Sequence, residues 1–373
     1  MGAADWQYSW RFLTPEGRII MMPDALQTGH LKKLLTEIGL WQHTQGDQPH
    51  ARHGYSIDDE ARGLIVGLRY WQTGTEVEFS KRLAETCFHF LQNATITAGR
   101  NEGRYHNFCD AQGKWLDSVG SDDSFGRTLW GLGVAAAVDA PFAPRSSAET
   151  LLRRSLPRID SMQANFLRAK AFVILGLAAS RVDDGRLCEQ ATLLAEAYDA
   201  TAEHNWHWFE EQMTYCNARL PQALFAAAEF LPNPDHFLRI ATDSLDFLLQ
   251  ATRNDKGSFN PIGNAPMEFD GWFKHGQARP PLFDQQPVDA GALVEACVAA
   301  WSATGELRFR QAALEAFSWY LGSNVHGLPV YDSVTGGVAD AVTREGISSN
   351  QGAESVLSIH LAFQALSALE NIQ

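Results

Sequence analysis

The stretch LWGLGVAAAV at positions 129–138 determines how this sequence of 373 residues is interpreted. Its small and apolar residues cover every face of a helix, and a helix of that kind is stable only when it is buried on all sides. Four later segments share this composition: AKAFVILGLAA at 169–179, LPQALFAAAEF at 220–230, AGALVEACVAA at 290–300 and LSIHLAFQAL at 357–366. The sequence therefore predicts several helices that pack against one another in the interior.

Amphipathic helices alternate with these buried helices along the chain. We expect outer helices at 24–40, 76–94, 147–156, 186–204, 234–252 and 305–322. We expect inner helices at 58–71, 123–138, 161–180, 217–230, 288–303 and 350–370. The inner helices begin roughly 40 to 72 residues apart, a spacing too irregular for a tandem solenoid. The pattern predicts an all-α fold, an (α/α)6 barrel of six helical hairpins in a single domain over 1–373; the alternative is an open helical array or a less regular bundle.

Two insertions lack helical periodicity. The stretch RYHNFCDAQGKWLDS at 104–118 alternates around a DAQG turn and predicts a small β-hairpin near 104–117. The stretch from 255 to 286 is rich in glycine and proline. Because loops of this length are usually functional, we expect it to serve the site.

Charge and cysteine content limit the classes of partner. Lys and Arg number 30 and Asp and Glu 44, which gives a net charge of −14. Such a surface repels nucleic acid and anionic membranes and favours a neutral substrate. The sequence shows no signal peptide and no apolar run of roughly 20 residues, so we expect a cytoplasmic protein. The cysteines are odd in number and widely spaced, which predicts reduced thiols: Cys87, Cys109, Cys188, Cys216 and Cys297.

Polar residues gather where the inner helices are expected to begin. Helix capping explains Asp58, Ser121 or Asp122, but arginines close to a helix N-terminus oppose its dipole and need another explanation. If the inner helices form one ring, these clusters meet at its mouth, where carboxylates, amides, arginines and aromatic rings suit a sugar. The residues expected to bind the sugar are Tyr55, Asp58, Arg62, Asp122, Arg127, Trp208, Glu210, Tyr215, Asn217, Arg219, Gln222, Trp272, Gln285, Gln286, Asp289, Asn350 and Gln351.

A succession of motifs over nearly the whole chain resembles a known family. The motifs are MPDALQTGHLKKLLTEIGLWQH at 22–43, GYSIDDEARGL at 54–64, DDSFGRTLWGLG at 122–133, MTYCNARLPQAL at 213–224, DQQPVDAGA at 284–292 and NQGAES at 350–355. The sequence is similar to a helical domain often found behind bacterial glycosyltransferase domains, which belongs with the six-hairpin glycosidase-like toroids. The resemblance implies a bacterial enzyme that cleaves a glycosidic bond with two carboxyl groups, often with inversion. The acid/base motifs of glucoamylases, trehalases and disaccharide phosphorylases are absent.

An inverting glycoside hydrolase is therefore the first hypothesis for function. Asp123 and Glu211 are the preferred catalytic carboxylates, followed by Asp59 and Glu354. The acid is expected in an apolar setting such as that beside Trp208, and the base beside an arginine.

Two other functions are open. A sugar epimerase or isomerase needs a base, often a pair of histidines, and five are available: His204, His207, His275, His326 and His360. A non-catalytic glycan-binding partner of a glycosyltransferase needs no acid pair. We expect neither a metal nor a cofactor, because zinc, EF-hand and dinucleotide spacings are all absent.

Overall fold

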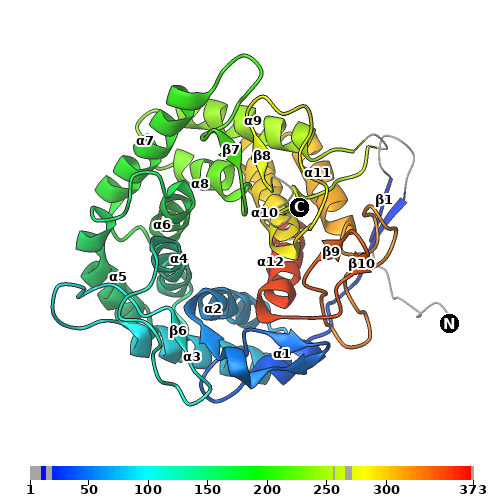
Figure 1. Cartoon of the computed structure of the whole chain (residues 1–373). Helices are drawn as coiled ribbons and strands as arrows, with labels where there is room; N and C mark the ends of the chain where they lie inside the picture. The colour runs from blue at the N-terminus through cyan, green and yellow to red at the C-terminus, as the bar shows by residue number, and fades with distance from the viewer. Residues whose placement is uncertain (1–9, 14–18, 255–256, 265–270, 371–373) are drawn as a thin grey trace.

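The computed structural model describes residues 10–13, 19–254, 257–264 and 271–370. Six inner helices form a closed ring, and the last of them packs against the first (Figure 1). In ring order they are α2 (Ile57–Gln72), α4 (Asp122–Val138), α6 (Leu167–Ser180), α8 (Arg219–Ala228), α10 (Pro287–Thr304) and α12 (Ala353–Glu370). The predicted (α/α)6 barrel is confirmed.

Outer helices surround this ring. They are α1 (Gly29–Leu34), α3 (Val77–Ala94), α5 (Arg145–Ile159), α7 (Asp184–Thr201), α9 (Pro234–Ala251) and α11 (Leu307–Ser318). Apart from α1 and α6, the helices begin within about three residues of the predicted positions, the usual uncertainty of helix ends.

The prediction of a helix over 24–40 is wrong at both ends, because α1 covers only Gly29–Leu34. After α1 the chain turns, and the Thr36 hydroxyl accepts hydrogen bonds from the backbone of Ile38 and Gly39. The Leu40 amide then donates to the buried Glu60 carboxylate at 2.6 Å. These tertiary and local bonds replace the helical ones.

The helix α6 begins six residues later than the predicted 161. The amide of Gln163 donates to the Asp122 carboxylate on α4 at 2.9 Å, which holds the preceding segment as turns. Lower down, α4 and α6 approach closely at two glycines. A Cβ on Gly133 would lie 2.2 Å from the Gly176 carbonyl oxygen, and one on Gly176 would lie 2.3 Å from that of Leu129.

Strands occur only as short antiparallel pairs in the described part of the chain. They are β1 (Trp10–Leu13) with β2 (Ile19–Met22), β3 (Thr44–Gln45) with β4 (Gln48–Pro49), β5 (Tyr55–Ser56) with β6 (Phe108–Cys109), β7 (Gln212–Met213) with β8 (Phe273–Lys274), and β9 (Val342–Thr343) with β10 (Gly346–Ile347). A 3-10 turn covers Ala51–His53.

The insertion at 104–118 folds back as predicted, with Cys109 bridged to Trp115 and the Leu116 amide bonded to the Phe108 carbonyl. Its strand β6 also pairs with β5, which leads directly into α2. This pairing ties the hairpin to the first inner helix.

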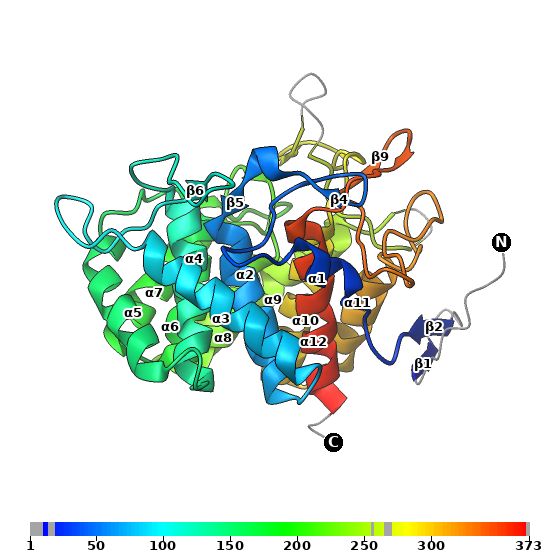
Figure 2. The ribbon, with the colours of Figure 1, turned by 90° about the horizontal axis from the view of Figure 1, so that it is seen from below.

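The loops before the inner helices gather on one side of the ring (Figure 2). We call this side the mouth: the N-terminal ends of the six inner helices together with the loops that precede them. No helix among the described residues is long and apolar enough to cross a membrane.

Candidate active site

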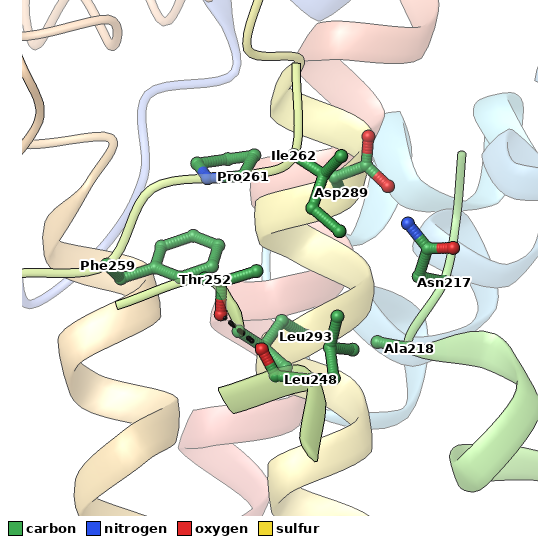
Figure 3. Close-up of a pocket in the computed structure, with 9 residues that line it drawn as sticks. All are labelled: Asn217, Ala218, Leu248, Thr252, Phe259, Pro261, Ile262, Asp289 and Leu293. Atoms are coloured by element: carbon green, nitrogen blue, oxygen red, sulfur yellow. Dashed lines mark hydrogen bonds between the residues drawn. The ribbon is translucent and has the colours of Figure 1, made fainter. Parts of the chain in front are cut away.

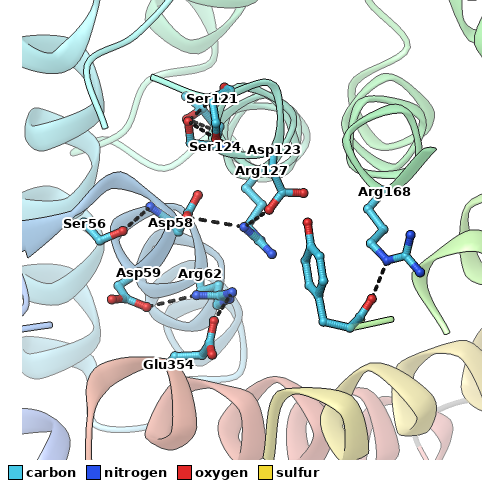
Figure 4. A network of polar contacts seen from close by, with 12 residues as sticks. Ser56, Asp58, Asp59, Arg62, Ser121, Asp123, Ser124, Arg127, Arg168 and Glu354 are labelled. Carbon is cyan, nitrogen blue, oxygen red and sulfur yellow. Dashed lines mark hydrogen bonds and ion pairs between the residues drawn. The ribbon is translucent and has the colours of Figure 1, made fainter. Parts of the chain in front are cut away.

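Two serines cap the helices that carry the aspartates of the mouth. The Ser56 hydroxyl accepts from the Asp58 amide at 3.3 Å, and the Ser121 hydroxyl accepts from the Ser124 amide at 3.1 Å. Because serines provide the caps, the carboxylates of Asp58 and Asp123 can make other contacts (Figure 4).

Arg127 connects these two carboxylates. Its Nη1 lies 2.5 Å from Asp123 Oδ2 and 3.3 Å from Asp58 Oδ2. Its guanidinium also packs over the Phe172 ring, 4.6 Å from the centroid. Since both oxygens contact one nitrogen, they lie at most about 6 Å apart, which is below the separation in inverting glycosidases.

Arg62 forms a second bridge, from α2 to α12. It contacts Asp59 at 2.9 Å and Glu354 at 2.7 Å. The Asp59 side chain is buried, whereas that of Glu354 is 44% exposed. Glu354 can therefore touch a ligand, and Asp59 acts on a ligand only through Arg62.

Arg168, on α6, was not among the residues expected to bind sugar. It contacts Glu210 at 2.6 Å, Asn217 at 2.9 Å and the Tyr215 carbonyl at 2.5 Å. Its guanidinium lies 5.2 Å from the centroid of the Tyr215 ring. The signal that could have identified it is the one used for Arg62 and Arg127, an arginine in the first turns of an inner helix.

A short segment, 214–217, crosses the mouth and carries Tyr215. Asn217 closes it by accepting from the Thr214 amide and donating to the Thr214 carbonyl. The Cys216 amide donates to Asp289 at 2.6 Å, and Cys216 has a φ of 47°, which is unusual for a residue with a side chain. The ring of Trp272 lies 6.3 Å from that of Tyr215.

Asp289 lies beside a small cavity between the segment 214–217 and α9 (Figure 3). The cavity volume is ≈ 10 Å³, about the space of one water molecule. Thr252 and Pro261 form its outer wall. Asp289 thus supports the segment that carries Tyr215 from behind.

Burial shifts the acidity of three of these carboxyl groups. It raises the pKa of Asp58, and the nearby guanidinium groups of Arg127 and Arg62 offset this only in part. Burial raises the pKa of Asp59 to about 7 in spite of Arg62. It also raises the pKa of Asp289 to about 7, although the Cys216 amide stabilises the charged form.

Carboxyl groups outnumber arginines at the mouth. The acidic residues are Asp58, Asp59, Asp123, Glu210, Asp289 and Glu354, and the basic ones are Arg62, Arg127 and Arg168. An anionic substrate is disfavoured here, whereas a neutral substrate that develops positive charge during reaction is favoured.

Several predicted residues lie away from this cluster. The Glu211 side chain is 80% exposed and lies 3.4 Å from His275 Nδ1, so it does not join the mouth carboxylates. Asp122 turns away from its neighbour Asp123 and binds Arg104 at 2.7 Å. These residues are removed from the site because their carboxylates have other partners.

Two predicted aromatic residues belong to the core. Tyr55 is fully buried and stacks on Trp41 with a centroid distance of 4.5 Å. Trp208 is also fully buried, with an edge-on contact to Phe209. Apolar packing, rather than sugar stacking, accounts for both.

Although α8 begins at Arg219, the Arg219 side chain binds Glu295, which lies well inside α10. We call the set around this contact the deep layer: Arg69, Arg219, Gln222 and Glu295. Arg219 donates to Gln222 at 2.6 Å and contacts Glu295 at 2.7 Å, and Arg69 contacts Glu295 at 3.1 Å. Glu295 follows Asp289 on α10 by six residues, or about 9 Å along the helix. Burial raises the pKa of Glu295, but Arg219 and Arg69 outweigh burial and leave it below the ordinary value.

The remaining predicted amides support loops. Gln285 is buried and accepts from the Trp319 indole at 2.8 Å. Asn350 accepts from the Gly46 amide at 3.0 Å. Gln286 immediately precedes α10 and makes no side-chain cap, while the buried Gln351 Oε1 has no hydrogen-bond partner.

The five histidines considered for isomerisation lie in separate surroundings, apart from His204, His207 and His275, which line one groove beside the mouth. His360 is buried against the Tyr70 hydroxyl at 2.6 Å, and burial lowers its pKa to about 4. His326 contacts the Thr343 carbonyl, His275 stacks on Trp206, and His207 lies near Tyr198. Across the described residues, no group of acidic, histidine and cysteine side chains is arranged to hold a metal ion.

Structural comparison finds the same ring of helices in enzymes that are named for their action on sugars. Cellobiose 2-epimerase from Bacillus thermoamylovorans B4167 superposes with a TM-score of 0.69 at 12% identity, covering 93% of this chain and 96% of that one. A D-mannose isomerase gives 0.67 at 11% identity, covering 92% and 94%. The chain has the six-hairpin glycosidase-like toroid fold.

A third similar structure is a hydrolase. It is an inactive variant of an α-1,6-mannanase of Salegentibacter sp. HEL1_6, in which two consecutive aspartates are replaced by asparagine, in complex with α-1,6-mannotriose. Its TM-score is 0.60 at 10% identity, covering 92% of this chain and 97% of that one. No protein-family profile and no curated protein matches the sequence. At these identities the similarity shows the fold, and the activity must be argued from the site.

Proposed function

We propose that this protein is a glycoside hydrolase that cleaves a neutral glycoside or oligosaccharide with two carboxyl groups, Asp58 and Asp123. One observation carries the proposal: both carboxylates contact the same nitrogen of Arg127, at the accessible end of the ring. Their side chains are 22% and 19% exposed, so a substrate can reach them.

The two aspartates take different roles because their surroundings differ. Burial raises the pKa of Asp58, which favours the protonated form that a general acid needs. Asp123 has the closer contact with Arg127 and takes the role of the charged carboxylate. Asp58 would donate its proton to the leaving oxygen while Asp123 attacks the anomeric carbon. Water would then attack that carbon, giving a proton to Asp58 and releasing the sugar from Asp123.

The spacing supports a retaining reaction rather than the inverting one expected from sequence. Retaining enzymes place their carboxyl groups about 5–5.5 Å apart, whereas inverting enzymes need roughly 6.5–9.5 Å to hold a water molecule. The shared contact with Arg127 keeps the two nearest oxygens below the inverting range. Glu354, with the Arg62 bridge, would bind hydroxyl groups of the same sugar.

Replacing Asp123 and Asp58 by asparagine tests the proposal. The wild type is screened against aryl glycosides and oligosaccharides of mannose, glucose and galactose, with new reducing ends and the product anomer followed by NMR. We expect Asp123→Asn and Asp58→Asn each to lower kcat by about 10²- to 10⁴-fold, the usual range for an acid or base.

Asp122→Asn is the matched control, because Asp122 neighbours Asp123 but binds Arg104 and the Gln163 amide. This variant should lose thermal stability and keep its kcat. Wild-type turnover in Asp123→Asn, or isomerisation of free aldoses without hydrolysis, would contradict the proposal. Association with a glycosyltransferase and a cytoplasmic location stay predictions from the sequence.

A further inference from the structure

A second concave surface lies next to the mouth, outside the ring. This groove has a volume of ≈ 880 Å³, within the range of small-molecule sites. Four segments line it: the loop 204–207, the stretch from Phe247 on α9 to Asn254 just after it, the pair Asn260 and Pro261, and the loop from Phe273 to Leu282. The sequence prediction that the long glycine- and proline-rich loop serves the site directs attention to this groove.

The strand pair β7–β8 separates the groove from the mouth. On one side lie Tyr215, just after β7, and Trp272, just before β8, and their rings face each other at the mouth. On the other side, Phe273 and His275 line the groove. The groove and the mouth are close together. The amide of His275, in the groove, donates to the Glu211 carbonyl, and the adjacent Glu210 binds Arg168 in the mouth.

The chemistry of the groove differs from that of the mouth. None of its described lining residues is acidic, and both of its arginines are engaged: Arg253 contacts Glu315 at 3.1 Å, and Arg279 also has a partner.

Five carboxamides line the groove, and a carboxamide carries both donor and acceptor atoms for a hydroxyl group. Two of their oxygens already accept from backbone amides, that of Asn254 from Ser258 and that of Gln277 from Lys274. The five are Asn205, Gln250, Asn254, Asn260 and Gln277.

Asn260 provides an independent indication of a ligand. Its side chain is only 7% exposed, and its Oδ1 has no hydrogen-bond partner. Buried polar atoms are normally bonded, so an unpaired amide in a groove wall is a position where a ligand hydroxyl can bind. The ring of His275, which stacks on the buried Trp206, adds exposed aromatic surface to the groove.

Hydrogen bonds and shared wall residues also connect the groove to the site. The Trp206 indole donates to the Glu210 carbonyl at 2.7 Å. Thr252 and Pro261 are shared between the groove and the small cavity behind Asp289 (Figure 3). A molecule that spans the mouth and the groove would therefore contact one continuous wall.

We infer that the groove binds further sugar residues of a neutral glycan whose reacting end lies in the mouth, so that the substrate is an oligosaccharide rather than a simple glycoside. This inference rests on the proposed function. The carboxamides would bind hydroxyl groups of the distal residues, and the β7–β8 pair would support the glycan between the two sites.

The experiment compares long and short glycans in variants of the groove. The probes are cellohexaose, maltohexaose and α-1,6-mannohexaose, together with the corresponding disaccharides, bound to Asp123→Asn protein and followed by calorimetry. Asn260→Ala should weaken binding of the preferred hexasaccharide about three- to tenfold, the effect of one hydrogen bond, and leave the disaccharide unchanged. Gln250→Ala, on the exposed end of α9, is a second variant that cannot disturb the core.

Equal losses for hexasaccharide and disaccharide, no loss for either, or no binding of any probe would each overturn the inference. The readout is binding without turnover, so it is separate from the hydrolysis assay. If the wild type binds these glycans in the groove but cleaves none, the proposed hydrolysis fails and the groove assignment stands.

Discussion

In the deep layer, Glu295 lies between two arginines, whereas at the mouth Arg127 lies between two aspartates. The side chains of Glu295 and Arg219 are almost completely buried, and Arg69 contacts Glu295 from its other side. The mouth carries an excess of carboxylates that solvent and substrate can reach. The deep layer therefore joins the inner helices, whereas the charges of the mouth are available for a ligand.

The largest expected effect is on stability, in the deep layer. Glu295→Leu leaves the buried Arg219 without a counter-charge, and removing one partner of a buried ion pair typically costs about 3–5 kcal/mol. Urea denaturation should show this loss of unfolding free energy. A cost below 1 kcal/mol, as for a surface pair, would remove the distinction between the two layers.

The mouth should respond in the opposite way. Glu354→Gln removes a carboxylate that is 44% exposed, and such pairs contribute only about 0–1 kcal/mol to stability. We expect the change in the free energy of unfolding to stay within this range. We expect kcat/KM to fall about tenfold or more, because a charged hydrogen bond to the sugar is lost. If stability fell as in the Glu295 variant while activity was unchanged, Glu354 would be a structural residue.

Asp289 gives a pH-dependent comparison. Its pKa is raised to about 7 in the folded state, so the contribution of Asp289 to stability is full below pH 4 and is lost as pH rises towards and through 7. Asp289→Asn, which carries no proton to lose, should show a smaller fall in Tm between pH 5 and pH 8 than the wild type. Parallel Tm curves for the two proteins would show that Asp289 is ionised throughout.

The smallest effects should separate two adjacent glutamates. Glu210→Gln weakens the contact with Arg168 and should lower kcat/KM several-fold. Glu211→Gln changes a side chain that is 80% exposed and should alter both stability and kcat/KM by no more than measurement error. Equal effects of the two changes would place Glu211 back in the site.

The ring could be predicted because helices that are buried on all sides have a recognisable composition, apolar on every face. Segments such as 290–300 contain apolar residues on every face, which requires burial on all sides, and the inner position in a double ring provides it. The length of α1 could not be predicted from the local sequence. The turn after α1 ends in a hydrogen bond from the Leu40 amide to the Glu60 carboxylate, which lies twenty residues beyond Leu40.

The site could be predicted as a region but not residue by residue. Helical position brought Arg62, Arg127 and Asp123 to the mouth, as the sequence indicated. Adjacent residues such as Asp122 and Asp123, or Glu210 and Glu211, have the same chemistry and differ only in direction. That direction depends on partners distant in sequence, Arg104 and Arg168 among them.

The contact between Gly133 and Gly176 has a consequence for the whole ring. Because neither position has room for even a methyl group, the backbones of α4 and α6 form a close seam in the wall. This seam fixes the distance between Arg127 and Arg168, which stand above it on the same two helices. An alanine at either glycine would push α4 and α6 apart. It would thereby separate Arg127 from Arg168 at the mouth without changing any residue that contacts the substrate.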